Sequence, residues 1–145
     1  MQKVKDIMSR DIATVNHHDN IFQAAVLMKE KNIGFVPVMD ENHVVGTLTD
    51  RDLVIRGYAQ KHSGSTKINE VMSPTIIAVS PETSLKEAAE KMAKEQIRRL
   101  LVIEQGHLVG IVALGDLAIR QAMEEQAGAA LGDISEPEHS APPVN

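Results

Sequence analysis

Apolar and polar positions along the chain follow one order of elements, and that order occurs twice. In the first copy an extended segment at 12–15 precedes an apolar stripe with helical spacing, formed by Ile21, Ala24, Ala25 and Met28. Two apolar runs, 33–39 and 44–48, flank a polar turn and predict a β-hairpin. A second helix is expected from Asp52 to about residue 59. The pattern therefore predicts a β-α-β-β-α unit.

The second copy repeats this unit 64 residues later without a gap. When 3–56 is aligned with 67–120, 17 of the 54 pairs are identical. Its helical stripe is Leu85, Ala88, Ala89 and Met92, and its hairpin runs are 97–103 and 108–112. The segments Asn20-x-x-Gln23 and Ser84-x-x-Glu87 both match helix-start capping boxes. The duplication predicts two halves related by a local two-fold axis, with a cleft between them.

The repeats also set the expected domain boundaries. We expect a first repeat at 1–59, a linker at 60–67 and a second repeat at 68–126. Repeats of about 60 residues are marginally stable alone, so we expect the two to share one core. Residues 127–145 are rich in Gly, Pro, Ser and acidic side chains, and they indicate a disordered tail.

Composition excludes several classes of protein. The net charge is −5, with no basic block, which disfavours a nucleic-acid partner. The absence of Cys excludes disulfides and thiolate chemistry, and the six His show no metal-ligand spacing. His43 and His107 are equivalent, and both fall at expected hairpin turns. No apolar stretch is long enough for a signal or a membrane span, so we expect a cytoplasmic protein. No catalytic motif is present, and we expect neither enzymatic activity nor a metal.

The segments at both ends of each copy carry a resemblance to a known family. These are Val4-Lys5-Asp6-Ile7-Met8-Ser9 and Ile68-Asn69-Glu70-Val71-Met72-Ser73-Pro74 at the front, and the stretches 46–53 and 110–117 at the back. With Ile33-Gly34-Phe35-Val36-Pro37-Val38 between them, they resemble a tandem pair of cystathionine β-synthase (CBS) domains over residues 3 to about 120. The resemblance implies an α+β (α/β) fold of two β-α-β-β-α repeats with pseudo-two-fold symmetry, a CBS-pair (Bateman) module.

Thr49 and Asp52 are expected at a helix N-terminus, where two roles are open. Backbone N–H groups there favour a phosphate, and an ionised Asp accepts hydrogen bonds from ribose hydroxyls. The same pair also fits a helix cap that binds nothing. The family commonly binds adenosine nucleotides through a Gly-x-x-Thr/Ser-x-x-Asp pattern, which the resemblance assigns to Gly46, Thr49 and Asp52.

The resemblance further implies composite sites built from both repeats. One site combines Thr49 and Asp52 with Ile77, Ile97, Arg98 and Arg99, and the arginines would bind phosphates. The alternative for Arg98 and Arg99 is a solvated strand edge. The second site combines Ala13, Ile33, Gly34 and Asp116. It departs from the pattern, because Ala113 replaces the hydroxyl and Gly34 and Phe35 stand where the other copy has arginines. It should be weak, empty or suited to a less charged ligand.

The expected function is that of a stand-alone regulatory module. It would bind an adenosine-type ligand such as AMP, ADP, ATP or S-adenosylmethionine, require no cofactor, and pass occupancy to an unknown protein partner. The resemblance also implies a homodimer formed through helices, for which the small residues of the two stripes permit close approach. The alternative is a constitutive dimerisation or scaffold protein whose ligand site is no longer functional.

Overall fold

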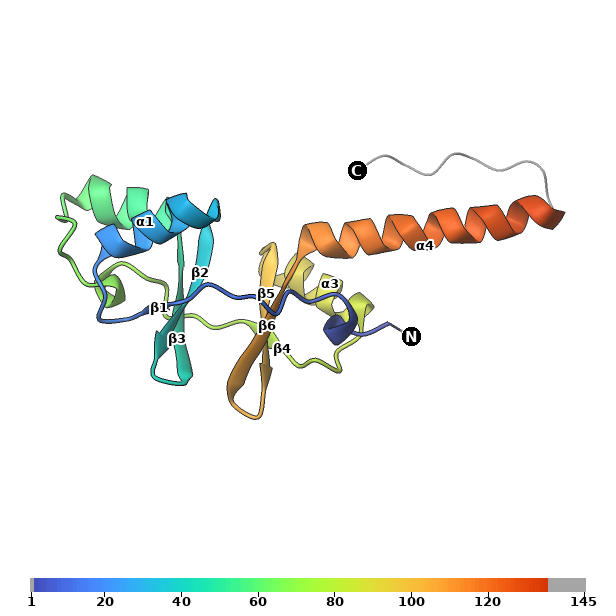
Figure 1. Ribbon diagram of the computed structural model, residues 1–145, viewed down its shortest axis with the longest axis horizontal. Helices are drawn as coiled ribbons and strands as arrows, with labels where there is room; N and C mark the ends of the chain where they lie inside the picture. Colours follow the sequence, from blue (N-terminus) through green and yellow to red (C-terminus); the bar gives the residue numbers. More distant parts are fainter. Residues whose placement is uncertain (1, 136–145) are drawn as a thin grey trace.

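The computed structural model describes residues 2–135 and contains two similar α+β halves (Figure 1). The first repeat contains η1 (Val4–Asp6), β1 (Val15–Asn16), α1 (Ile21–Lys31), β2 (Phe35–Asp40), β3 (His43–Thr49), α2 (Asp50–Asp52), η2 (Leu53–Gly57) and η3 (Tyr58–Gln60). The second contains η4 (Ile68–Glu70), β4 (Ala78–Val79), α3 (Leu85–Glu95), β5 (Arg99–Glu104), β6 (His107–Ala113) and α4 (Leu114–Ser135). The predicted β-α-β-β-α order is thus present in both halves.

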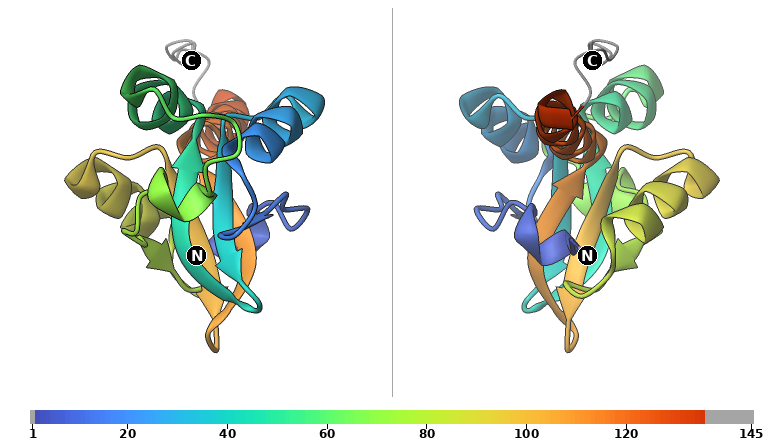
Figure 2. Two further views of the ribbon diagram at one scale, coloured as in Figure 1. Left: turned by 90° about the vertical axis from the view of Figure 1, so that its left-hand side faces the viewer. Right: turned by 90° about the vertical axis from the view of Figure 1, so that its right-hand side faces the viewer.

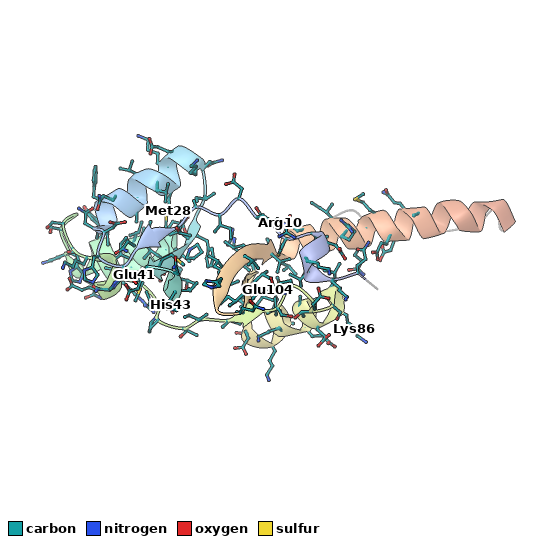
Figure 3. All side chains as sticks on the ribbon, turned by 60° about the horizontal axis from the view of Figure 1, so that its bottom comes forward. Arg10, Met28, Glu41, His43, Lys86 and Glu104 are labelled. Atoms are coloured by element: carbon teal, nitrogen blue, oxygen red, sulfur yellow. The ribbon has the colours of Figure 1, made fainter. Side chains whose placement is uncertain are left out.

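Each half has a three-stranded sheet of the same topology. Strand β1 is parallel to β2, and β2 is antiparallel to β3; β4, β5 and β6 repeat this order. Both hairpins even shift register at equivalent places, between Val38 and Met39 and between Val102 and Ile103. The hairpin tips point to one end of the molecule, and Figure 3 shows Glu41 and His43 at the first tip. The expectation that His43 and His107 lie at hairpin turns is confirmed, since each begins the second strand of its hairpin.

The predicted capping residues begin helices α1 and α3. The Asn20 side chain accepts a hydrogen bond from the Gln23 N–H, and the Gln23 side chain accepts one from the Asn20 N–H. At α3 the Ser84 hydroxyl accepts from the Glu87 N–H at 3.1 Å and donates to the Glu87 carboxylate. These bonds satisfy N–H groups that a helix start leaves unpaired. Both helix starts therefore lie where the sequence predicted them.

The repeats exchange their N-terminal segments and do not share one core. Val4 and Met8, at the start of the first repeat, are buried in the cluster of the second repeat with Ala88, Met92 and Leu100. In the reciprocal direction, Ile68 and Val71 complete the cluster of the first repeat, which contains Val15, Ile21, Ala24, Met28, Val36, Val38 and Leu48. The expected single core is therefore wrong. Each half is completed by a segment from the other.

Backbone hydrogen bonds and two glycines hold the exchanged segments in place. Ser73 and Thr47 exchange two N–H···O bonds of 2.9 Å, and Ser9 and Ile111 do the same at 2.8 and 3.0 Å. The segments thus lie against the free edges of β3 and β6. A Cβ on Gly46 would lie 2.4 Å from the Ser73 carbonyl oxygen, and one on Gly110 would lie 2.6 Å from the Met8 sulfur. These close approaches explain why both copies have glycine here.

A surface ion pair also holds the N-terminal segment to the second half. The ammonium groups of Lys3 and Lys5 each lie 2.7 Å from a carboxylate oxygen of Glu82. The hydrogen bonds from Lys3 and then Lys5 lower the pKa of Glu82 to about 2. In return, the hydrogen bond and the charge of Glu82 raise the pKa of Lys5.

Three expectations differ from the structure. Helix α4 begins at Leu114 and runs to Ser135, so the expected tail is helical from 127 to 135; its remaining residues, 136–145, lie outside the described part. The second helix of the first repeat is irregular, with α, π and 3-10 geometry in turn between Asp50 and Gln60. Ala24 and Ala88 are fully buried within their own halves, so among the four alanines of the two stripes only the exposed Ala25 and the half-buried Ala89 are accessible to a second molecule.

Candidate ligand-binding site

A cavity of about 790 Å³ lies between the two halves, and it brings together most of the first predicted site. Five of the six predicted residues line it: Thr49, Ile77, Ile97, Arg98 and Arg99. Thr49 ends strand β3 of the first half, and the other four come from the start of β5 and the segments before β4 and β5 of the second. The larger cavity, as we call it, is therefore composite in the way that the resemblance implied.

Asp52 is the exception, because it is not among the residues that line the larger cavity. Its carboxylate accepts a hydrogen bond from the Thr49 N–H at 3.0 Å, and the Thr49 hydroxyl accepts from the Asp52 N–H at 3.0 Å. Arg56 Nε lies 3.9 Å from the other carboxylate oxygen, and the Asp52 side chain is 17% exposed. The capping role considered for this pair is thus confirmed. The Thr49 hydroxyl still has its own proton to donate.

Two residues between Thr49 and Asp52 line the cavity and were missed in the sequence. Asp50 and Arg51 occupy the first turn of α2, and both face the larger cavity. The Asp50 N–H donates to the Gly34 carbonyl at 3.0 Å, and a Cβ on Gly34 would lie 2.7 Å from an Asp50 carboxylate oxygen. Gly34 therefore makes room for Asp50. The sequence did carry one indication of these residues. Asp50 and Arg51 occupy the two unspecified positions of the Thr-x-x-Asp pattern, and these positions begin the helix beside the cleft.

The charges on the wall of the larger cavity favour an anionic ligand. Arg51, Arg98 and Arg99 line it, and the carboxylate of Asp50 opposes them. Three cations and one anion leave a formal charge of +2. Arg98 and Arg99 are both exposed to solvent and have no ion-pair partner among residues 2–127, whose side chains are described. They are thus solvated, as the alternative expected, and they also face the cavity. Guanidinium groups in this state are available to a phosphate.

A smaller cavity of about 280 Å³ corresponds to the second predicted site. Ala13, Ile33 and Gly34 line it, whereas Asp116 does not. Asp116 lies in the first turn of α4 and is exposed. The charged groups of this wall are Asp11 and Arg99, which balance formally. The lining of the smaller cavity therefore carries less net charge than that of the larger cavity.

The described residues contain neither a metal-ligating cluster nor a membrane-spanning helix. Between residues 2 and 135 there is no group of three or more His, Cys, Asp or Glu side chains arranged to hold a metal ion. His17 Nε2 lies 3.5 Å from a carboxylate oxygen of Asp40, and its ring contacts that of His18 edge to face. Across the same residues, none of the helices has the length and apolarity needed to cross a membrane.

Comparison with known proteins identifies close relatives along nearly the whole chain. The chain is 47% identical to the CBS domain-containing protein YhcV of Bacillus subtilis over 93% of its own length and 96% of that protein. It is 36% identical to hypoxic response protein 1 of Mycobacterium tuberculosis, with 81% of this chain and 84% of the relative covered.

Solved structures share the fold, and one of them contains adenosine ligands. The CBS domain pair of protein MJ0100, in complex with 5-methylthioadenosine and S-adenosyl-L-methionine, superposes with a TM-score of 0.76 at 27% identity, over 86% of this chain and 98% of that one. A structure of hypoxic response protein I with two coordinated zinc ions gives a TM-score of 0.75 at 34% identity, over 83% and 99%.

The family model named CBS domain matches the chain twice, at residues 4–57 and 68–122. These two matches coincide with the two copies of the β-α-β-β-α unit. The chain therefore belongs to the CBS domain family and carries a tandem pair of its domains.

Proposed function

We propose that this protein is a regulatory module that binds an adenosine nucleotide in the larger cavity and signals its presence to a protein partner. The observation that carries the proposal is the composite wall of that cavity. It contains a hydroxyl donor at Thr49, apolar side chains at Ile77 and Ile97, and guanidinium groups at Arg98 and Arg99. These groups match the ribose, the flat base and the phosphate of one ligand.

The similar CBS pair with bound adenosine ligands supports the ligand class but not its identity. The formal charge of +2 on the wall favours a phosphorylated nucleoside, AMP, ADP or ATP, over S-adenosylmethionine, which carries a positive sulfonium. Asp52 would contribute through the oxygen that does not accept from Thr49, once the ligand draws the Thr49–Asp52 turn toward the cavity. No catalytic group is assigned, and no cofactor is needed for such binding.

A ligand panel tests the proposal. AMP, ADP, ATP, adenosine and S-adenosylmethionine at 100 times their dissociation constant should stabilise the fold by about 2.7 kcal/mol, since they bind only the folded chain. For a chain of this size this is a rise of roughly 5–10 °C in melting temperature. Calorimetry on the same ligands should give a higher affinity for the phosphorylated ones than for adenosine. A panel that moves the melting temperature by less than about a degree would contradict the proposal.

A constitutive scaffold is the second candidate, and the exposed apolar residues favour association in either case. Phe22, Tyr58, Ile119 and Met123 are between 58% and 83% exposed. They lie on α1, η3 and α4. Figure 2 shows that α1, the helical segment at 50–60 and α4 all lie opposite the hairpin tips, at what we call the helical end of the molecule, and Figure 1 shows α4 apart from the other two along the long axis. An exposed apolar surface of this kind favours burial against a second copy. We therefore propose a homodimer through this helical end. Ligand binding, not dimerisation, separates the two candidates.

A further inference from the structure

Phe35 and Arg99 form a contact that crosses the local two-fold axis. They occupy the same position in the two repeats, 64 residues apart, and each begins the middle strand of its sheet. The guanidinium carbon of Arg99 lies 5.5 Å from the centre of the Phe35 ring, which is cation–π geometry. A contact between equivalent positions of a two-fold pair lies at the axis. An arginine and a phenylalanine here make the axis chemically asymmetric.

The same two residues belong to the walls of both cavities. Gly34, Phe35 and Arg99 line the larger cavity, and they line the smaller one as well. The two cavities are thus separated by a wall that one side chain from each repeat forms. Any movement of the Arg99 side chain changes the shape of both.

Arg99 contributes a different share of the positive charge in each cavity. In the larger cavity it is one of three guanidinium groups, beside Arg51 and Arg98. Among the residues that line the smaller cavity it is the one cation, and it balances the carboxylate of Asp11. When Arg99 turns fully toward the larger cavity, the wall of the smaller cavity therefore changes from formally neutral to −1.

We propose that Arg99 couples the two cavities, because a phosphate in the larger cavity draws its guanidinium away from the Phe35 ring. The inference rests on the proposed function, in that the anion is the phosphate of an adenosine nucleotide. A solvent-exposed cation–π contact is weak, whereas an arginine–phosphate pair is charge-assisted and often bidentate. The arginine–phosphate pair is therefore the stronger of the two interactions, and the Arg99 side chain moves to the phosphate.

The coupling is selective for charge. With Arg99 turned to the first phosphate, Asp11 is left uncompensated and disfavours a second anion in the smaller cavity. The face of the half-buried Phe35 ring that Arg99 leaves is then available to an uncharged planar ring. A nucleotide in the larger cavity thus weakens the binding of a second nucleotide but not that of a neutral nucleoside. The two occupancies are linked, and the link is reciprocal.

The chain offers a direct probe, because it contains only two phenylalanines. Selective labelling of phenylalanine gives NMR signals from Phe35 and from Phe22, which lies on α1 and is 64% exposed. Phe22→Leu assigns the two sets. Addition of AMP should move the ring signals of Phe35 along the same saturation curve as the heat of binding, and leave those of Phe22 in place.

Two matched variants decide whether Arg99 carries the effect. Arg99→Leu and Arg98→Leu each remove one charge from the larger cavity, but Arg98 does not line the smaller one. Arg98→Leu should weaken AMP and keep the full Phe35 shift at saturation. Arg99→Leu should abolish that shift.

Three results overturn the inference, and they separate it from the proposed function. Binding of AMP with unmoved Phe35 signals shows that Arg99 stays on the ring. A Phe35 shift that persists in Arg99→Leu shows that the nucleotide contacts the ring directly. If no ligand of the panel binds the parent chain by calorimetry, the proposed function itself fails and the coupling with it.

Discussion

Gly46→Ala tests how closely the exchanged segment of the second repeat packs against strand β3. The added methyl group would stand 2.4 Å from the Ser73 carbonyl oxygen and 2.8 Å from the Met72 sulfur. The sulfur ends a flexible side chain and can move, but the oxygen belongs to the backbone. The segment must therefore withdraw from β3 by close to an ångström, since ordinary contacts of this kind are about 3.4 Å. Both 2.9 Å hydrogen bonds between Thr47 and Ser73 are then stretched.

The expected loss of stability follows from these contacts. Two weakened backbone hydrogen bonds remove about 0.5–1.5 kcal/mol each, and overpacking adds about 1–3 kcal/mol. The reduced freedom of the unfolded chain returns about 0.4–1 kcal/mol. The net loss is about 1–5.5 kcal/mol, or roughly 2–20 °C in melting temperature for a chain of this length. Urea unfolding and thermal melting of the purified variant measure it.

Two other glycines serve as graded controls. A Cβ on Gly110 would meet mainly the Met8 side chain, with the Ser9 carbonyl oxygen at 3.1 Å, so Gly110→Ala should lose less than Gly46→Ala. Gly115 in α4 has open space, and Gly115→Ala should stabilise by up to about 1 kcal/mol. If Gly46→Ala melts within about a degree of the parent, or Gly110→Ala loses more, the close packing of the exchanged segment is refuted.

Three further predictions concern the site, the pH dependence and the dimer. Arg98→Ala should weaken AMP about tenfold or more in calorimetry, because a hydrogen bond to a charged group is lost, while Asp116→Ala should change it little; the reverse order would show that the wrong site was chosen. The pKa of Glu82 lies near 2 in the folded chain, below its unfolded value, so its stabilisation is present above about pH 4.5 and lost as the pH falls toward 2; Glu82→Gln should flatten that part of the urea-midpoint profile, and an unchanged profile would count against the ion pair. Light scattering should find a dimer for the parent but a monomer for Ile119→Asp combined with Met123→Asp. The control Lys86→Asp, at a residue of α3 that Figure 3 labels, should remain a dimer. A monomeric parent would exclude the dimer.

The local elements were predictable because their signals are local. Capping boxes at Asn20 and Ser84 and the alternating hairpin runs specify helix starts and strands within a few residues. The composite cavity was predictable only through the family resemblance, which placed Thr49 opposite Arg98. Asp50 and Arg51 were missed because their orientation depends on where α2 begins. The exchange of segments was not visible either, since Val4 and Ile68 are apolar residues at equivalent positions of the two repeats, and the sequence pattern is the same for both.

The length of α4 was predicted wrongly for a different reason. We predicted a disordered tail at 127–145 because Gly, Pro, Ser and acidic residues dominate that stretch, but residues 127–135 by themselves are rich in Ala and Gly. Alanine is the best helix former, however, and a helix already nucleated at Leu114 continues with little further cost. Composition alone gave the wrong prediction here, because the extension of a helix depends on the helical turn that precedes it.

The exchange of N-terminal segments also sets an order of events while the chain is being synthesised. The first core takes its residues from Val15 to Val71 and is complete once that continuous stretch has left the ribosome. The second core needs Val4 and Met8 together with residues up to Leu117. Lys3 finds its partner Glu82 only 79 residues later. At about 5–20 residues per second, the segment around Val4 waits several seconds for its place, so it is made before the first core but folds after it.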